Sequence, residues 1–374
     1  MAISLFIAGD VVPKGVQPEV FKSKGAQIFN EMRPYIKESD YAIVNLEAPV
    51  INGKPSPIKK SGPNLGVATS TVDVLKEVGF NIITLANNHF FDQEQPGVDW
   101  TLNKINECGI RSVGGGRNIF EARKPLLVEH EGCRIAIINA CEHEFSIANS
   151  EHGGSNPLDL INVHDDIASV RSNVDYVILI LHGGVEGYQY PTPRMKRWYR
   201  HFIDIGADAI INHHQHCTNG YEVYKGKPIF YGLGNFYFPG SKELRPDSWF
   251  YGYAVLLCLD DIISFKLIPY SQNENGISLR EDVLFADEMK LLNYPIADDF
   301  LLQQKFDDFV IEHERNIKAS ILPSFMQGRY ISIMARHGLM GRLYKGSDIY
   351  SIKNRLTCES HYEVLQRVFT IGTK

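Results

Sequence analysis

Residues 210–220 read IINHHQHCTNG and place His213, His214 and His216 directly after a short apolar run. A polar ring that is buried without a hydrogen-bonding partner is costly, so packing alone does not favour this arrangement. A single histidine at a strand end is ordinary, because it can be a satisfied core residue. Whether this cluster binds a ligand therefore depends on where similar side chains fall in the rest of the chain.

Other apolar runs also end on side chains that bind metals. The runs ISLFIAG (3–9), AIVNL (42–46), NIITLA (81–86) and YVILIL (176–181) are typical of buried strands. They are followed by residues that carry a carboxylate, an amide or an imidazole, namely Asp10, Glu47, Asn87, Asn88, His89, Asp92 and His182. Because sites form at the carboxyl edge of parallel sheets, we expect these side chains to meet at one sheet edge.

The residue types indicate the metal chemistry. Carboxylate, amide and imidazole ligands suit manganese, iron, zinc or magnesium. The cysteines form no C-x-x-C pair, which argues against a disulfide framework or a structural zinc site. The ligands exceed what one four-coordinate ion needs, so we expect two divalent ions that share a bridging carboxylate. Such a pair lowers the pKa of a bound water to about 7.

The composition is that of a globular protein. The chain has 374 residues, of which 44% are hydrophobic and 22% charged, enough for one large domain and an extension. A net charge of −6 argues against a nucleic-acid partner. No basic leader precedes Ile3, and no apolar run approaches the ~20 residues of a membrane helix. We therefore expect a cytoplasmic protein without a transmembrane segment.

Strand-like and helix-like segments alternate up to residue 271. One helix is expected over residues 25–39, and hairpins are expected at Glu131-Gly132, Lys225-Gly226 and Asp260-Asp261. Parallel βα units followed by late hairpins predict a layered α/β sandwich for residues 1–271. Residues 272–374 are mostly helical in pattern and are expected to form a C-terminal extension.

Basic residues interleave with apolar ones in the extension. They are Arg329, Arg336, Arg342 and Lys345. A basic amphipathic helix can lie on an anionic membrane surface, so peripheral membrane contact is one interpretation. The favoured interpretation is a helix that packs on the core and exposes a solvated basic face. The sequence specifies no oligomeric state.

Several blocks resemble a known family. They are AGDVV (8–12), VNLEAPV (44–50), GFNIITLANNHFFDQEQPGVDWTL (79–102), residues 181–216 and GKPIFYGLGNFYF (226–238). In order and spacing they resemble the CapA family of poly-γ-glutamate capsule biosynthesis proteins, within the calcineurin-like metallophosphoesterases. The resemblance covers residues 3 to about 238. It implies a four-layer αββα sandwich and a metal-dependent hydrolase linked to capsule or exopolysaccharide formation.

The resemblance also implies metal ligands. Glu47 stands where the wider superfamily has a bridging aspartate. The first metal would bind Asp10 and His216, and the second would bind Asn88, His182 and His214. Val12 replaces the histidine of the superfamily's first motif. The first metal would therefore have few protein ligands and bind more weakly.

A catalytic pair follows from the same resemblance. His89 would protonate the leaving oxygen, and Asp92 would orient His89. Gly183 stands where the family often has tryptophan, which we expect to open space near the site.

Further residues are candidates for contact with the substrate or the metal ligands. His213 and Asn235 belong to this group, although Asn235 could serve only a backbone turn. Glu186 is either a polar group next to the site or a solvated loop acid. In CEHEFS (141–146), Glu142, His143 and Glu144 could line the pocket.

Three functions are consistent with this pattern. The first is a phosphoesterase that acts on a small molecule or a polymer. The second is an amide hydrolase of a γ-glutamyl polymer, because two ions polarise a carbonyl as readily as a phosphoryl oxygen. The third is a capsule-assembly or polymer-binding component without turnover. His89 and Asp92 favour an enzyme, since a binding module needs no proton donor.

Overall fold

The computed structural model describes residues 3–60, 62–240, 244–280, 282–320, 333–334 and 337. The chain divides into two units, Met1–Phe306 and Asp307–Lys374. The basic positions of the predicted extension, Arg329, Arg336, Arg342 and Lys345, lie outside the described residues. Among the helices that are described, none is long and apolar enough to cross a membrane.

The larger sheet is centred on β1 (Ile3–Val11), which pairs in parallel with β2 and antiparallel with β16. Its strand order is β18-β17-β16-β1-β2-β5-β6, and β15 pairs with β1. The other bounds are β2 Tyr41–Leu46, β5 Ile82–Thr84, β6 Arg111–Val113, β15 Asn235–Tyr237, β16 Tyr251–Leu259, β17 Ser264–Asn273 and β18 Gly276–Leu279. The parallel strands β1, β2 and β5 direct their carboxyl ends to one edge.

The smaller sheet has the strand order β13-β14-β12-β11-β9-β8, with a parallel centre. Its strands are β8 Leu126–His130, β9 Cys133–Cys141, β11 Tyr176–His182, β12 Ala209–His213, β13 Tyr221–Tyr224 and β14 Lys227–Phe230. The predicted hairpins are confirmed as β8-β9, β13-β14 and β16-β17. At Glu131-Gly132 and Lys225-Gly226 both residues have positive φ, as a two-residue turn between twisted strands requires.

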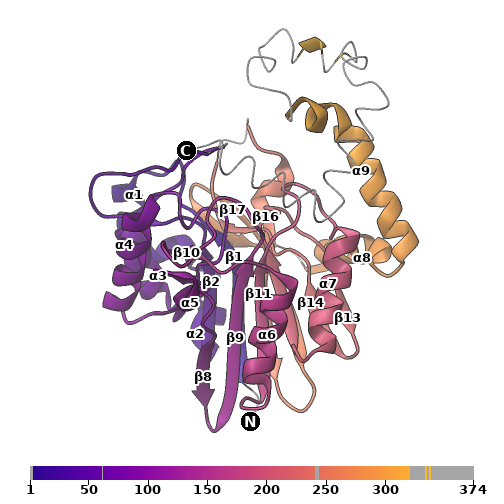
Figure 1. The fold of residues 1–374 in the computed structure, drawn as a ribbon, viewed down its shortest axis with the longest axis horizontal. Helices are drawn as coiled ribbons and strands as arrows, with labels where there is room; N and C mark the ends of the chain where they lie inside the picture. The colour runs from indigo at the N-terminus through magenta and orange to yellow at the C-terminus, as the bar shows by residue number, and fades with distance from the viewer. Residues whose placement is uncertain are drawn as a thin grey trace. The chain divides into compact units, whose positions relative to one another are not determined.

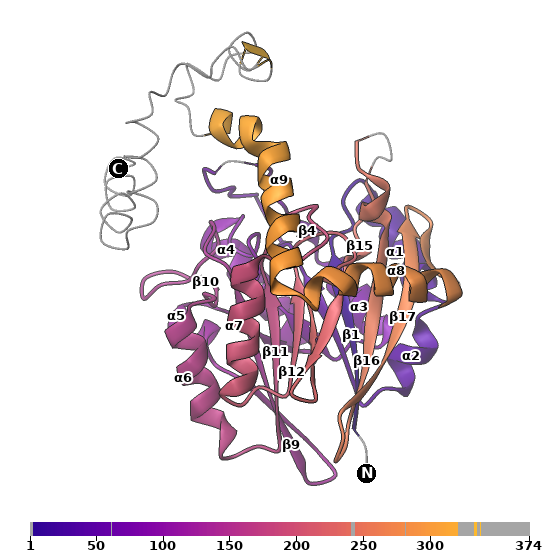
Figure 2. The same ribbon diagram turned by 90° about the vertical axis from the view of Figure 1, so that its right-hand side faces the viewer.

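The predicted four-layer αββα arrangement is confirmed by the apolar clusters of the described residues. Leu5 and Ile7 of β1 pack between the two sheets with Ile178 and Ile180 of β11. The alternate residues of β1 face the helices on the outer side of the larger sheet, and those of β11 face α6 and α7. Figure 2 shows these layers side by side, and Figure 1 shows α6 and α7 over the smaller sheet.

Each sheet is covered on its outer face by its own set of helices. Those on the larger sheet are α1 Pro18–Lys24, α2 Arg33–Glu38, α3 Ser70–Val78 and α4 Glu94–Glu107. Those on the smaller sheet are α6 Leu160–Arg171 and α7 Pro193–Asp204. The remaining short elements are η1 Gly25–Phe29, β3 Val50–Ile51, β4 Val67–Ala68, β7 Gly115–Gly116, α5 Ile119–Ala122, β10 Gly154–Ser155 and η2 Asp247–Phe250.

Two expectations from the sequence need correction. The single helix predicted over residues 25–39 is divided into η1 and α2. Pro34 has no N–H to donate to a carbonyl four residues earlier, which prevents one continuous helix through this segment. The larger sheet also continues past residue 271, because β17 and β18 form a further hairpin. The helices of the predicted extension begin after this hairpin. They are α8 (Asp282–Ile296) and α9 (Asp299–Ser320).

Candidate metal centre

Strand register brings the predicted ligands together from both sheets. In the larger sheet, Asp10 lies beside Asn45 of β2 and Asn235 of β15. In the smaller sheet, His182 of β11 pairs with His213 of β12. The expectation of a single sheet edge is therefore wrong, because the centre forms where strand ends of two packed sheets meet.

The ligand atoms form overlapping groups, within each of which all atoms lie within 4.8 Å of one another. One group contains Asp10, Glu47 and His216, and another contains Glu47, His182 and His214. Glu47 belongs to both groups. This is the arrangement expected of two neighbouring cations that share one carboxylate.

Glu47 shows most directly that the residues fit a cation. Its side chain is 0% exposed, and neither carboxylate oxygen has a hydrogen-bond partner among the described residues. Burial, and then the charge of Asp10, raise the pKa of Glu47 well above its usual range. An unpaired buried carboxylate is costly, and bound divalent cations would compensate its charge.

His182 and His216 are held in the neutral form that binds metals. Burial lowers the pKa of His182 well below its usual range and that of His216 to about 3. Asn235 Nδ2 donates to the Trp249 carbonyl oxygen at 3.1 Å, and its Oδ1 lies 2.8 Å from His216 Nδ1. His216 Nδ1 therefore carries the proton, and Nε2, 3.6 Å from Glu47 Oε1, keeps its lone pair. Asn235 thus orients His216, a candidate ligand, and support of the metal ligands is one of the roles expected for it.

The backbone of the histidine turn is strained. His214 has φ 97° and His216 has φ 56°, in the region that favours glycine. Such conformations persist only where the surroundings over-determine them, and they cluster at functional sites. The His214 N–H donates to Asp10 Oδ2 at 3.3 Å, which ties the turn to the opposite sheet.

Hydrogen bonds also orient Asn88 and Asp10. Asn88 Nδ2 donates to Glu144 Oε2 at 3.2 Å, so that its Oδ1 lies 3.1 Å from His182 Nε2. Asn45 Nδ2 donates to Asp10 Oδ1 at 2.6 Å. Sequence reasoning missed Asn45, although its position in the VNLE block beside Glu47 was a signal that it points to the same edge.

A second cluster contains His89 and Asp92. His89 Nδ1 lies 2.6 Å from Asp92 Oδ2, and the Leu65 N–H donates to the same oxygen at 2.7 Å. Lys60, which sequence reasoning missed, forms an ion pair with Asp92 Oδ1 and lies 3.1 Å from His89 Nδ1. The side chains of Lys60 and Asp92 are 2% and 0% exposed. The carboxylate of Asp92 is therefore anchored on both oxygens.

Replacing Lys60 with methionine should lower the free energy of unfolding by about 3–5 kcal/mol, because Asp92 would remain buried without its cation. Urea denaturation of the metal-free chain measures this loss. Lys60→Met combined with Asp92→Asn is the matched control and should recover part of it. A single variant as stable as the wild type would contradict the ion pair.

Two further candidate residues, Glu186 and His213, lie in different environments. Glu186 is exposed, and its charge contributes to the raised pKa of Glu47 after burial and Asp10. Burial lowers the pKa of His213 to about 3, and its Nδ1 lies 4.0 Å from Asp10 Oδ1. His213 also forms a ligand group with Asp10 and His182. His213 therefore lies among the candidate ligands, whereas the sequence predicted only contact with the ligands or the substrate.

The segment after β9 divides between two environments. Glu144 approaches the centre, with Oε1 3.6 Å from His214 Nε2. Glu142 instead pairs with Arg194 and accepts a hydrogen bond from the Gly184 N–H at 3.2 Å. A Cβ at Gly183 would lie 2.6 Å from Glu142 Cγ. The expectation that Gly183 opens space is wrong, because Glu142 fills it.

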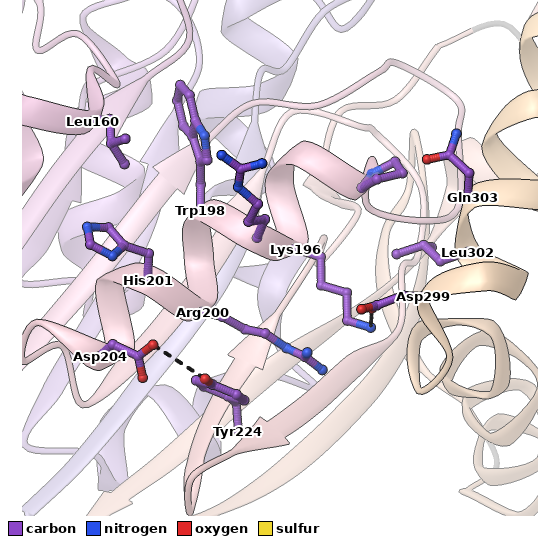
Figure 3. Close-up of a pocket in the computed structure, with 12 residues that line it drawn as sticks. Leu160, Lys196, Trp198, Arg200, His201, Asp204, Tyr224, Asp299, Leu302 and Gln303 are labelled. Carbon is purple, nitrogen blue, oxygen red and sulfur yellow. Dashed lines mark hydrogen bonds and ion pairs between the residues drawn. The ribbon is translucent and has the colours of Figure 1, made fainter.

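A cavity of about 610 Å³ lies away from these residues, beside α7 and the start of α9 (Figure 3). Two of the cations that line it are paired. Lys196 Nζ lies 2.5 Å from Asp299 Oδ1, and Arg200 Nη2 lies 2.6 Å from Glu222 Oε2. Arg197 lines it as well. The predicted ligands do not line it, so this cavity is separate from the candidate metal centre.

The raised pKa of Glu47 predicts how stability depends on pH without metal. Between its ordinary pKa of 4.5 and the higher native value, the native state binds more protons than the unfolded state. Wild-type stability should therefore fall with rising pH relative to Glu47→Gln, by up to about 1.4 kcal/mol per pH unit.

Urea denaturation in chelator from about pH 5 to about pH 8 measures this difference. Both proteins retain Asp10, whose pKa is raised, and His182, whose pKa is lowered, so the comparison isolates the effect of the Glu47 carboxyl group together with its coupling to Asp10. A difference in the free energy of unfolding between the two proteins that stays constant across this pH range would contradict the raised pKa of Glu47.

Residues 4–240 match the family described as bacterial capsule synthesis protein PGA_cap. The chain belongs to this family. The chain is 30% identical over 290 residues to the capsule biosynthesis protein CapA of Bacillus anthracis, covering 75% of the chain and 66% of that protein. It is 30% identical over 306 residues to the PGA biosynthesis protein CapA of Bacillus subtilis (strain 168), covering 81% and 76%. The family predicted from the sequence blocks is confirmed.

A solved phosphatase structure from Mycoplasma pneumoniae is 18% identical to this chain, with a TM-score of 0.48, covering 73% of this chain and 95% of that one. The NAD nucleotidase of Haemophilus influenzae is 14% identical, with a TM-score of 0.42, covering 84% and 60%.

Proposed function

We propose that this chain is a two-metal hydrolase of the metallophosphoesterase type that cleaves a phosphoester in capsule or exopolysaccharide biosynthesis. The observation that carries the proposal is Glu47, buried, unpaired and shared between two ligand groups. Manganese, iron, zinc or magnesium suits these ligands. Bound ions would supply Lewis acidity and an activated water. Asp10 and His216 would hold the first ion, and Asn88, His182 and His214 the second.

The protein's own residues would move the proton. Asp92 holds His89 through Nδ1, which leaves Nε2 available to protonate the leaving oxygen. Lys60 holds Asp92 in place through its ion pair. A site that only binds a polymer needs neither group, so this cluster supports an enzyme over an assembly component.

The names of the relatives favour one alternative substrate. The Bacillus subtilis relative is a PGA biosynthesis protein, and a Mycobacterium tuberculosis relative is a probable polyglutamine synthesis accessory protein. The same centre would polarise an amide carbonyl, so hydrolysis of a γ-glutamyl polymer is the second candidate. The scattered cysteines, without C-x-x-C pairs, support a cytoplasmic location.

Turnover by the full chain tests the proposal. The chain is treated with chelator, reloaded with Mn²⁺ and assayed on bis-p-nitrophenyl phosphate, on a panel of phosphomonoesters and on a γ-glutamyl peptide. Metal-dependent release of phosphoester product supports the phosphoesterase. Cleavage of the peptide alone supports the amide hydrolase. If the metal-loaded chain cleaves none of them, the capsule-assembly component replaces both enzyme proposals.

A further inference from the structure

A cation lies close to the candidate ligand His216, separated from it by an indole ring. The ring centroids of His216 and Trp249 are 4.5 Å apart, and Arg245 Cζ lies 3.9 Å from the Trp249 ring centroid. Trp249 Nε1 donates to the Phe238 carbonyl oxygen at 2.7 Å, which fixes the indole. A guanidinium that stacks on an aromatic ring keeps its N–H donors free for an anion.

Lys14 is a second cation in the same region. The segment of Lys14 lies beside that of Arg245, because the Val12 N–H donates to the Tyr237 carbonyl oxygen at 2.9 Å and the next residue, Phe238, packs on Trp249 with ring centroids 5.0 Å apart. Partial burial, and then the positive charge of Arg245, lower the pKa of the Lys14 ammonium, which agrees with this placement. Within the described ranges, neither of them has a hydrogen bond or ion pair to a carboxylate. Lys196 and Arg200, by contrast, are both paired. Two neighbouring cations without a counter-charge repel each other, and a bound anion removes that repulsion.

Lys14 also lines a cavity of about 250 Å³ whose other described lining residues are uncharged. Val12, Val16, Phe21 and Leu65 give it an apolar wall. Two of its lining residues connect the cavity to the centre. Val12 follows Asp10 by two residues, and Leu65 donates its N–H to Asp92. A ligand group in this cavity would therefore lie on the same side of the molecule as the centre.

We propose that Lys14, Arg245 and this cavity form a subsite for an anionic group, a carboxylate or a phosphate, carried on an aliphatic stem of the substrate. The apolar wall accommodates the stem, and the two cations bind the charge. The proposal rests on the proposed function, because it gives a second charged group to the substrate that is cleaved.

Calorimetry on the Mn²⁺-loaded full chain tests the subsite, with tripolyphosphate and a γ-linked glutamate tetramer as separate probes. Lys14→Gln and Arg245→Gln should each weaken binding roughly tenfold, because each removes charge-assisted hydrogen bonds. Lys37→Gln removes the same charge from an exposed position on α2 and should bind as the wild type does. Lys14→Arg keeps the charge and should restore most of the affinity. Tetramer binding identifies the anion as a carboxylate, and binding of tripolyphosphate alone identifies a phosphate.

The subsite is overturned if the wild type binds neither probe, or if Lys14→Gln and Arg245→Gln bind both unchanged. Turnover separates this failure from failure of the proposed function. A chain that binds as expected and hydrolyses nothing retains the subsite and rejects the hydrolase. A chain that hydrolyses phosphoesters, with the same KM for anionic substrates in the wild type and Lys14→Gln, retains the hydrolase and rejects the subsite.

Discussion

Replacing His89 with alanine should abolish most turnover and leave the metal content unchanged. A general acid contributes ~10²–10⁴-fold to rate, and kcat should fall by this amount. His89 lies in the cluster with Asp92 and Lys60, outside the ligand groups around Glu47. The measurements are kcat on bis-p-nitrophenyl phosphate and metal per chain by mass spectrometry.

His152 provides a matched control for His89. Its ring stacks on Phe91, two residues after His89, with centroids 4.6 Å apart. His152→Ala should therefore remove an imidazole from a segment that packs on the loop of His89, without a large change in kcat. Loss of metal from His89→Ala would contradict its assignment as a proton donor and place it among the ligands.

Glu47→Gln should lose both ions, whereas His214→Ala should lose mainly the second. The carboxylate of Glu47 belongs to both ligand groups, and an amide carries no charge with which to bridge two cations. Turnover should fall to the background rate in Glu47→Gln. Metal content after dialysis measures the loss.

Manganese titration of the wild type gives the reference for these variants. Two unequal affinities are expected, since Val12 offers no ligand to the first ion. Two ions retained by Glu47→Gln, or two equally tight sites in the wild type, would contradict the shared carboxylate or the role given to Val12.

The positions of Asp10, Glu47 and His182 could be predicted because each one directly follows or ends an apolar run. Local pattern shows where a strand ends, but it does not show which strand lies next to it. β1 pairs with β16, more than two hundred residues later in the chain. The sequence therefore predicted one shared edge, and the structure has two sheets whose strand ends converge.

Lys60 could not be predicted by the same reasoning. It lies in the irregular segment between β3 and β4, where no hydrophobic periodicity indicates which side chains are buried. Tertiary hydrogen bonds bring it to the site, including the Ile58 N–H to the Asp92 carbonyl oxygen at 3.1 Å. A lysine in a polar loop is usually solvated, and only the path of the chain places this one against a buried aspartate.

The positive φ angles at His214 and His216 connect metal supply to the amount of this protein in a cell. Strained residues cost of order 1–3 kcal/mol each, and the metal-free chain bears this cost together with the burial of the Glu47 carboxyl group without a hydrogen-bond partner among the described residues. Metal at about a hundred times its dissociation constant adds about 2.7 kcal/mol of stability to the folded state. Cellular proteases remove chains according to the fraction that is unfolded. We therefore expect cells starved of divalent metal to lose this protein by degradation while its messenger RNA stays constant.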